Sequence, residues 1–273
     1  MTMQYKIGII GAGNMGEALI RGLLHSKRVR PNEIIASRRN AKKLAGYRRQ
    51  YRIHTTSSNS EIMESAENII LAIKPQNIDL LLPEIKKSLK KNHLILSIAA
   101  GIDTGKLKKG LKNHNAIVRV MPNLPALVDL GISGIYCTPK VSSRQRRLAH
   151  QIFEAVGKTV EVPNEKWLDA ITGLSGTGPA YLFAMIEALI SAGKKVGLPE
   201  SLSKHLTLET ILGAAQMALQ SDEAPEKLRA RVTSKKGTTW AAMKVFKKRK
   251  FWKLIEEAVG AATKRAKELR GKK

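Results

Sequence analysis

Three glycines near the start of the chain have the spacing of a turn that binds phosphate through the main chain. Gly11, Gly13 and Gly16 form G-x-G-x-x-G between an apolar run at 5–10 and an amphipathic stretch at 15–25. The first glycine permits a tight turn, the second lets a pyrophosphate approach the backbone, and the third lets helix and strand pack closely. The helix N-terminus then favours the phosphates. The pattern predicts a dinucleotide site; the alternative is an ordinary glycine-rich turn.

The end of the second predicted strand, 33–37, indicates which dinucleotide would bind. An acidic residue at this place binds the 2′-hydroxyl of NAD, whereas arginine accommodates a 2′-phosphate. The strand ends in Ser37, Arg38 and Arg39, without a carboxylate. A hydroxyl and two guanidinium groups suit a phosphate dianion. We therefore expect NADPH to be preferred, with NADH as an alternative cofactor. The other interpretation is a plain cationic start to the next helix.

A second group of hydroxyl side chains lies far along the chain, in the segment RVTSKKGTTWAAM at 231–243. Thr233, Ser234, Thr238 and Thr239 surround Gly237 just before an apolar helical run. Hydroxyls and free N–H groups at a helix N-terminus suit a carboxylate ligand. The alternative is a capped turn, because Ser and Thr also favour helix caps.

The segment TGLSGTGPAYLF at 172–183 is rich in glycine. Gly173, Gly176 and Gly178 are poor choices inside a helix, so we expect this backbone to approach another group closely.

The elements that must position these residues change in kind along the chain. Helical stretches alternate with apolar runs up to residue 163, which indicates a mainly parallel sheet covered on both faces. From about residue 167 the apolar residues recur at helical spacing. The predicted fold is α/β, with a Rossmann-type doubly wound sheet at 1–163 and an all-helical domain at 164–273. The predicted strands are 6–10, 33–37, 68–73, 94–98, 116–120, 132–137 and 159–162.

The composition limits the classes of partner. Forty-eight Lys and Arg against 22 Asp and Glu give a formal net charge of +26, which is compatible with nucleic-acid binding or with attraction of small anions. The basic residues are dispersed and aromatic residues make up only 4%, so a base-stacking surface is poorly supported. We expect a small anionic substrate and no nucleic acid.

Other features argue against membranes, disulfides and metals. The most apolar segment, 180–192, contains Glu187 and is too short to span a bilayer, and the N-terminus lacks the pattern of a signal peptide. We therefore expect a cytoplasmic protein without a membrane partner. Cys137 is the single cysteine, which excludes an internal disulfide, and we expect a buried inert thiol. No His or Cys spacing predicts a metal site.

Five segments in order resemble the pyrroline-5-carboxylate reductase family over nearly the whole chain. GAGNMGEALIRGLL resembles the family's N-terminal fingerprint, LAIKPQ its A-x-K-P loop and RVMPNLPALV its R-x-M-P-N-T-P-A segment. TGLSGTGPAYLF and VTSKKGTTWAA resemble its two C-terminal signatures. The resemblance implies reduction of the cyclic imine 1-pyrroline-5-carboxylate to L-proline, the last step of proline biosynthesis. It also implies that the C-terminal helices form a homodimer or higher oligomer, with the substrate pocket where the dimer interface meets the nicotinamide.

The same resemblance implies roles for individual residues. Thr239 is expected to act in catalysis, because it matches the threonine whose hydroxyl faces the substrate nitrogen. Ser234, Gly237, Thr238 and Asp222 are expected to bind the substrate. The expected cofactor-binding residues, including the glycines and the end of the second strand, are Gly11, Gly13, Asn14, Met15, Gly16, Ser37, Arg38, Arg39, Asn59, Ala72, Lys74, Pro75, Ser97, Ala99, Met121, Pro122 and Asn123.

Three positions depart from the family pattern. Lys235 and Lys236 replace Pro and Gly in the hydroxyl-rich loop, Leu124 replaces Thr, and Asp222 replaces Glu. We interpret these as tuning of the substrate site.

Two other classes stay open. β-Hydroxyacid dehydrogenases and imine reductases share the two-part architecture; the former typically carry a lysine on the helix after a similar glycine-rich stretch. GTGPAYLFAMIEAL has no lysine, which argues against alcohol oxidation but leaves other imines possible. The second class is a basic nucleic-acid-binding protein that retains the fold.

Overall fold

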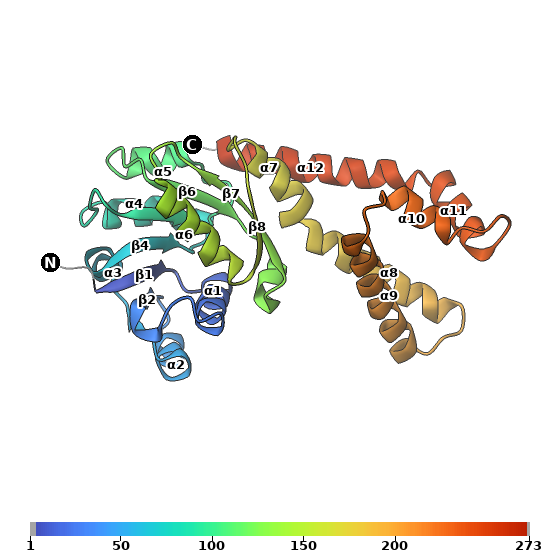
Figure 1. The fold of residues 1–273 in the computed structure, drawn as a ribbon, viewed down its shortest axis with the longest axis horizontal. Helices are drawn as coiled ribbons and strands as arrows, with labels where there is room; N and C mark the ends of the chain where they lie inside the picture. Colours follow the sequence, from blue (N-terminus) through green and yellow to red (C-terminus); the bar gives the residue numbers. More distant parts are fainter. Residues whose placement is uncertain (1–3, 272–273) are drawn as a thin grey trace. The chain divides into compact units, whose positions relative to one another are not determined.

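One eight-stranded sheet organises the first part of the chain. The structure, a computed structural model, describes residues 4–271. The strand order is β3-β2-β1-β4-β5-β6-β7-β8, and every neighbouring pair is parallel except β6 and β7 (Figure 1). The strands are β1 (Tyr5–Ile10), β2 (Ile34–Ser37), β3 (His54–Thr56), β4 (Ala66–Leu71), β5 (Leu94–Ser97), β6 (Ile117–Met121), β7 (Gly131–Cys137) and β8 (Gly157–Glu161).

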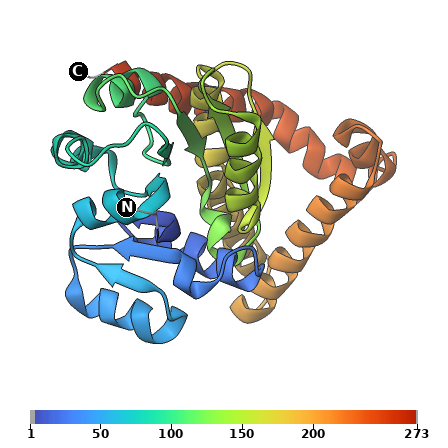
Figure 2. The same cartoon turned by 60° about the vertical axis from the view of Figure 1, so that its left-hand side comes forward.

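Helices cover both faces of this sheet. On one face, α1 (Asn14–His25), α2 (Ala41–Tyr51) and α6 (Ser143–Glu154) enclose a core that includes Ile9 and Phe153. On the other, α3 (Asn59–Ser65), α4 (Ile78–Ile85) and α5 (Thr104–Gly110) enclose a second core that includes Ile10 and Met63. Strands buried on both faces need apolar residues at successive positions, and the second halves of β1 and β4 fit this, because Ile9, Ile10, Ile69, Ile70 and Leu71 are all buried. Figure 2 shows the twist between the strands drawn in blue and those drawn in green.

The strand register places the ends of neighbouring strands at one edge. Ile10 pairs with both Ser37 and Leu71, and Leu71 pairs with Ser97. The chain therefore leaves β1, β2, β4 and β5 at the same edge. β1 lies between β2 and β4, where the strand order reverses direction, and ligands of open α/β sheets bind outside the carboxyl ends of the strands at this place.

The rest of the chain is helical, as the apolar spacing predicted. Three short 3₁₀ turns connect elements of the first part: η1 (Pro31–Glu33), η2 (Pro75–Asn77) and η3 (Leu124–Val128). The later elements are α7 (Trp167–Ile171), the π-helical η4 (Thr172–Gly176), α8 (Gly178–Lys195), α9 (Glu200–Gln220), α10 (Pro225–Arg231), α11 (Thr238–Lys248) and α12 (Phe251–Gly271). α8 and α9 pack side by side as a helical hairpin (Figure 1).

The chain divides into two compact units. One contains the chain up to Thr177 together with the end of α12 from Ala262, and the other is Gly178–Ala261. Among the described residues of α8 no side chain is buried, and the second unit exposes large apolar residues such as Phe183, Leu212 and Trp252. Such apolar surface is typical of a contact with another chain.

The sheet confirms the predicted fold class, with differences at single elements. β3 was not predicted, because three residues alternating between exposed and buried make a weak signal. The fourth strand spans Ala66–Leu71 rather than 68–73, since the chain leaves the sheet at Ala72. Cys137 lies buried on β7, and burial raises the pKa of its thiol, as expected of an inert residue.

Candidate functional site

A pocket of about 560 Å³ lies at the carboxyl ends of β1, β2 and β4. Eight of the predicted cofactor residues line it: Gly11, Gly13, Ser37, Arg38, Arg39, Asn59, Ala72 and Lys74. The other lining residues are Ile10, Asn40, Ser57, Ile73, Asn77, Leu80, Leu81 and Glu84. The strand register explains this convergence, because it places the ends of three strands at one edge.

The glycine turn has the geometry that the sequence predicts for a dinucleotide. Gly11 has φ of +88°, and its N–H and that of Ala12 donate to Ser37 O at 3.0 and 2.8 Å. A Cβ on Gly11 would lie 2.3 Å from Ile73 Cγ2, so the fold itself requires glycine there. A Cβ on Gly13 would have Gly11 O as its nearest neighbour, at 3.9 Å. The protein leaves open space beside Gly13, and this space belongs to the pocket. The main chain at Gly11–Gly13 and the open space beside Gly13 together form a cradle, and this cradle fits a bound pyrophosphate.

The end of β2 supplies the polar wall of the pocket. Ser37 Oγ donates to Asn59 Oδ1 at 2.6 Å, and Asn59 Nδ2 donates to Glu84 Oε2 at 3.1 Å. Arg38 is partly buried and Arg39 is exposed. Glu84 lies on α4 outside every recognised motif, so the sequence offered no signal for it.

The remaining predicted cofactor residues lie outside the lining of this pocket. Asn14 and Met15 form the first turn of α1, Gly16 packs that helix onto β1, and Pro75 begins η2. Ser97, Ala99 and the residues Met121, Pro122 and Asn123 lie farther along the same sheet edge, at the ends of β5 and β6.

The glycine-rich segment approaches the end of β6. Asn123 Nδ2 donates to Ser175 Oγ at 3.3 Å, and a Cβ on Gly176 would lie 2.5 Å from Met121 Cε. The close approach expected for this segment therefore occurs at Gly176. The segment is nevertheless helical, because Gly173 and Gly176 lie in η4 and Gly178 begins α8. A Cβ on Gly178 would meet nothing within 4 Å, so no close approach requires glycine there.

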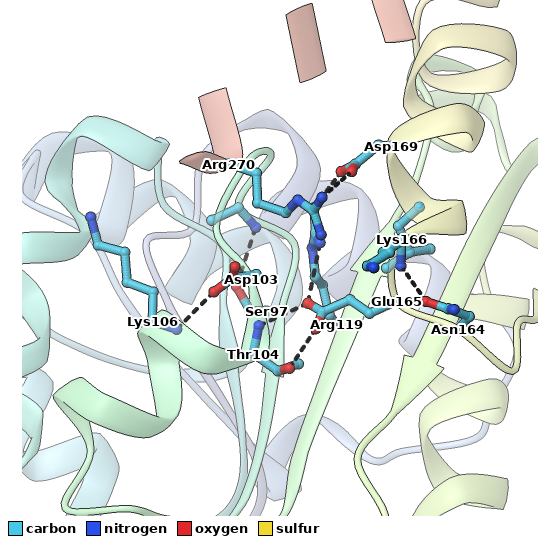
Figure 3. Close-up of polar contacts among 12 residues, drawn as sticks. Ser97, Asp103, Thr104, Lys106, Arg119, Asn164, Glu165, Lys166, Asp169 and Arg270 are labelled. Atoms are coloured by element: carbon cyan, nitrogen blue, oxygen red, sulfur yellow. Dashed lines mark hydrogen bonds and ion pairs between the residues drawn. The ribbon is translucent and has the colours of Figure 1, made fainter. Parts of the chain in front are cut away.

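A network of largely buried charges joins β6 to the start of α5 and to α7 (Figure 3). Arg119 of β6 is 3% exposed, and its guanidinium lies 3.2 Å from Glu165 Oε1 and 3.7 Å from Asp169 Oδ1. Glu165 also accepts hydrogen bonds from Thr104 N at 2.8 Å and Thr104 Oγ1 at 2.6 Å. Sequence reasoning missed this network, because its members come from α5, β6, α7 and the connection before α7.

The predicted substrate residues lie in the second unit. Ser234 O accepts a hydrogen bond of 3.0 Å from Gly237 N, which closes a turn directly before α11. Thr238 and Thr239 are the first two residues of α11, and its first turn contains no acidic residue. The positive end of this helix and the flanking Lys235 and Lys236 can attract a carboxylate.

Asp222 lies in the connection between α9 and α10, and its neighbour Glu223 forms an ion pair of 2.9 Å with Arg231. This pair ties the connection to the end of α10, directly before the turn. Leu124, which replaces a threonine of the family pattern, begins η3 and is half exposed.

Two properties of residues 4–271 concern membrane crossing and metal binding. None of the helices in this range combines the length and apolarity that crossing a bilayer requires. The same residues contain no group of three or more His, Cys, Asp or Glu side chains arranged to hold a metal ion.

The fold and the glycine-turn pocket define a protein with a Rossmann-type nucleotide-binding unit, and the family models place it among the oxidoreductases. A family model described as "NADP oxidoreductase coenzyme F420-dependent" matches residues 6–101, and one described as "Pyrroline-5-carboxylate reductase dimerisation" matches residues 165–269. The pyrroline-5-carboxylate reductase of Pseudomonas aeruginosa is 42% identical over 97% of this chain and 96% of its own. That of Synechocystis is 40% identical over 99% of this chain and 100% of its own. The chain belongs to the pyrroline-5-carboxylate reductase family.

Solved structures agree with this assignment. A pyrroline-5-carboxylate reductase from Coxiella burnetii has a TM-score of 0.91 and 37% identity over 99% of this chain and 100% of its own. Pyrroline carboxylate reductase of Plasmodium falciparum, solved with NADP bound, has a TM-score of 0.88 and 32% identity over the same shares. The predicted family, fold class and NADP-type cofactor are therefore confirmed, and the dimerisation model supports a homo-oligomer.

Proposed function

We propose that this chain reduces 1-pyrroline-5-carboxylate to L-proline with NADPH, as the last step of proline biosynthesis in the cytoplasm. The single observation that carries the proposal is the open cradle beside Gly13, in a pocket that also contains Ser37 and Arg38, on a chain of this family. The proposed division by function is 1–163 for dinucleotide binding and 164–273 for dimerisation and substrate binding, although residues 164–177 and 262–271 pack within the first compact unit.

The residues of the first unit would bind and orient the cofactor. NADPH, when bound, supplies the hydride that reduces the C=N carbon. The Gly11–Gly16 turn and the start of α1 would hold the pyrophosphate, and Ser37, Arg38 and Arg39 would hold the 2′-phosphate. We also assign Asn14, Met15, Asn59, Ala72, Lys74, Pro75, Ser97, Ala99, Met121, Pro122 and Asn123 to the cofactor.

The residues before and within α11 would hold a small anionic substrate. Ser234 and Thr238 supply hydroxyls for the carboxylate at the positive end of the helix. The N–H of Gly237 already serves the turn, so the contribution of Gly237 is the missing Cβ, which would lie 2.3 Å from Ser234 Oγ. Asp222 would lie near this site.

Thr239 would orient the ring by a hydrogen bond to the imine nitrogen. A protonated imine is already an electrophile, so the residues need only position it, which can remove up to about 7–11 kcal/mol of a barrier. The nitrogen keeps its proton in the product amine, so this step requires no acid–base histidine.

The direct test is oxidation of NADPH by the purified full-length chain on addition of 1-pyrroline-5-carboxylate. We expect turnover with NADPH at lower cofactor concentration than with NADH, and expect Arg38→Ala to raise the KM for NADPH. Absence of turnover with the imine would refute the proposed reaction, and a strong preference for NADH would refute the assignment of Ser37, Arg38 and Arg39. Tight salt-sensitive DNA binding without turnover would instead support the nucleic-acid alternative.

A further inference from the structure

Two residues fix the guanidinium of Arg38, one in the glycine turn and one on α2. Its Nη1 donates to Ala12 O at 3.0 Å and to the hydroxyl of Tyr47 at 2.8 Å. Ala12 belongs to the glycine turn and Tyr47 to α2, so both hydrogens of Nη1 serve contacts within the protein.

The hydroxyl of Tyr47 is itself anchored. It lies 2.9 Å from Glu17 Oε2 and 3.0 Å from Ala12 O. Since Arg38 donates to both Tyr47 and Ala12, the single hydroxyl proton of Tyr47 goes to the carboxylate of Glu17, the stronger acceptor. Tyr51, one turn later on α2, donates to Glu17 Oε1 at 3.1 Å.

This arrangement keeps the hydroxyl of Tyr47 protonated, and therefore a hydrogen-bond donor, at neutral pH. Tyr47 is 3% exposed, and burial, with Glu17 as the second cause, raises the pKa of its hydroxyl to about 12. The hydroxyls of Tyr47 and Tyr51 also donate one hydrogen bond to each oxygen of Glu17. Glu17 lies in the first turn of α1, the helix whose N-terminus would bind the phosphates.

The contacts determine which edge of Arg38 faces the pocket. Within residues 4–271, Nε and Nη2 of Arg38 have no hydrogen-bond partner, and Arg38 lines the pocket beside Ser37 and Arg39. The Nε–H and Nη2–H groups form one edge of a guanidinium and can bind two oxygens of one phosphate together. A guanidinium fixed beforehand loses less conformational entropy on binding than a free one.

We propose that Tyr47, backed by Glu17, is a positioning residue that presents the Nε/Nη2 edge of Arg38 to the 2′-phosphate and thereby raises selectivity for NADP(H) over NAD(H). The inference rests on the proposed use of NADPH and adds a residue that no recognised motif contains. Tyr47 acts through Arg38 and does not itself reach the ligand.

The experiment measures the Kd values of NADP⁺ and NAD⁺ by calorimetry on the full-length protein, without turnover. We expect Tyr47→Phe to raise the Kd of NADP⁺ about tenfold, as for a lost hydrogen bond to a charged group, and to leave the Kd of NAD⁺ nearly unchanged. Tyr51→Phe is the matched control, because Tyr51 binds the same carboxylate without touching Arg38. It should leave the ratio of the two Kd values unchanged.

A second variant separates positioning from folding. In an Arg38→Lys background, which keeps the charge but lacks the fork, Tyr47→Phe should have no further effect on the Kd of NADP⁺. An equal loss in both backgrounds would overturn the inference, as would an unchanged ratio of Kd values in Tyr47→Phe. If the wild-type protein itself fails to prefer NADP⁺, both the inference and the proposed NADPH preference are wrong. If only the variants fail to respond, the proposed function stands without Tyr47.

Discussion

Arg270, in the last turn of α12, forms an ion pair of 3.1 Å with Asp169 of α7 (Figure 3). Asp169 is 1% exposed, and its other oxygen faces Arg119. The end of α12 also packs beside the loop after β5, where a Cβ on Gly101 would lie 3.1 Å from Leu269 Cβ. The C-terminal residues of α12 therefore belong to the nucleotide-binding unit, and a buried carboxylate between two guanidinium groups anchors them there.

Removing this carboxylate should destabilise the protein strongly. We expect Asp169→Asn to lower the free energy of unfolding by about 3 kcal/mol, because two arginines lose a buried partner. Arg270→Ala should cost only about 1 kcal/mol, since the Arg270 side chain is partly exposed. Urea unfolding at fixed protein concentration measures both. The control is Arg265→Ala, whose exposed pair with Glu268 on the same helix should matter little; equal effects of all three variants would contradict the prediction.

Replacing Gly13 or Gly11 by alanine should have different effects on stability and on cofactor binding, although both glycines belong to the same turn. A Cβ at position 13 meets only Gly11 O, at an ordinary contact distance of 3.9 Å. The melting temperature of Gly13→Ala should therefore stay near that of the wild type, while NADPH binding weakens at least about tenfold. Gly11→Ala introduces a clash at positive φ and should lower the melting temperature. Calorimetry of NADP⁺ binding and thermal melting check both. Normal cofactor affinity in Gly13→Ala would place the pyrophosphate elsewhere.

Thr239→Val should lower kcat/KM at least about tenfold, as for the loss of a hydrogen-bond donor that acts in the transition state. Thr239 lies in the first turn of α11 and is only partly buried, so the variant should keep its fold. Steady-state kinetics with 1-pyrroline-5-carboxylate measure the effect, and circular dichroism controls for unfolding. Unchanged kinetics would remove Thr239 from the site.

Lys236 should be a point of local strain in the turn directly before α11. Its φ is +60°, a conformation that disfavours residues with a Cβ by about 1 kcal/mol. Lys236→Gly should therefore increase the free energy of unfolding by a similar amount, whereas Lys235→Gly, at a position without positive φ, should not. Urea unfolding of the two variants tests this, and a loss of stability in Lys236→Gly would show that the ammonium group matters more than the backbone.

His93 should make stability depend on pH. Its Nδ1 accepts a hydrogen bond of 3.0 Å from Lys90 N, and burial is the main cause that lowers its pKa to about 4. Between pH 6.5 and 4 the unfolded chain therefore binds a proton that the folded chain excludes. The neutral, buried imidazole of His93 therefore contributes to the free energy of unfolding above pH 6.5. This contribution is lost as the pH falls towards 4, by roughly 3 kcal/mol.

The measurement is urea unfolding across that range. His93→Gln, whose amide oxygen can accept from Lys90 N, should show a shallower pH dependence than the wild type. His25→Gln, at a highly exposed side chain, should not. Identical slopes for His93→Gln and the wild type would show that His93 is not responsible.

Local patterns predicted the parts of the nucleotide site that are adjacent in the chain. The glycine turn and Ser37–Arg39 each follow a strand directly, so their position at the sheet edge follows once the strands are parallel. Glu84 and Tyr47 were not predicted, because they reach the pocket and Arg38 from helices whose rotation no short motif encodes. Glu17 lies within the N-terminal fingerprint, but nothing in that pattern indicates its contact with Tyr47. Tyr47 is nine residues from Arg38 and 30 from Glu17, spacings with no periodic meaning.

The amino-acid sequence was sufficient to predict the fold class, the strand-to-helix turn and the positive charge at the end of β2. These depend on local preferences for backbone conformation and on the period of apolar residues. The tertiary structure alone decided that Arg119, Asp169 and Arg270 share one buried cluster and that Tyr47 supports Arg38. Such contacts join residues far apart in the chain, and only the packing of helices on both faces of one sheet sets their distances.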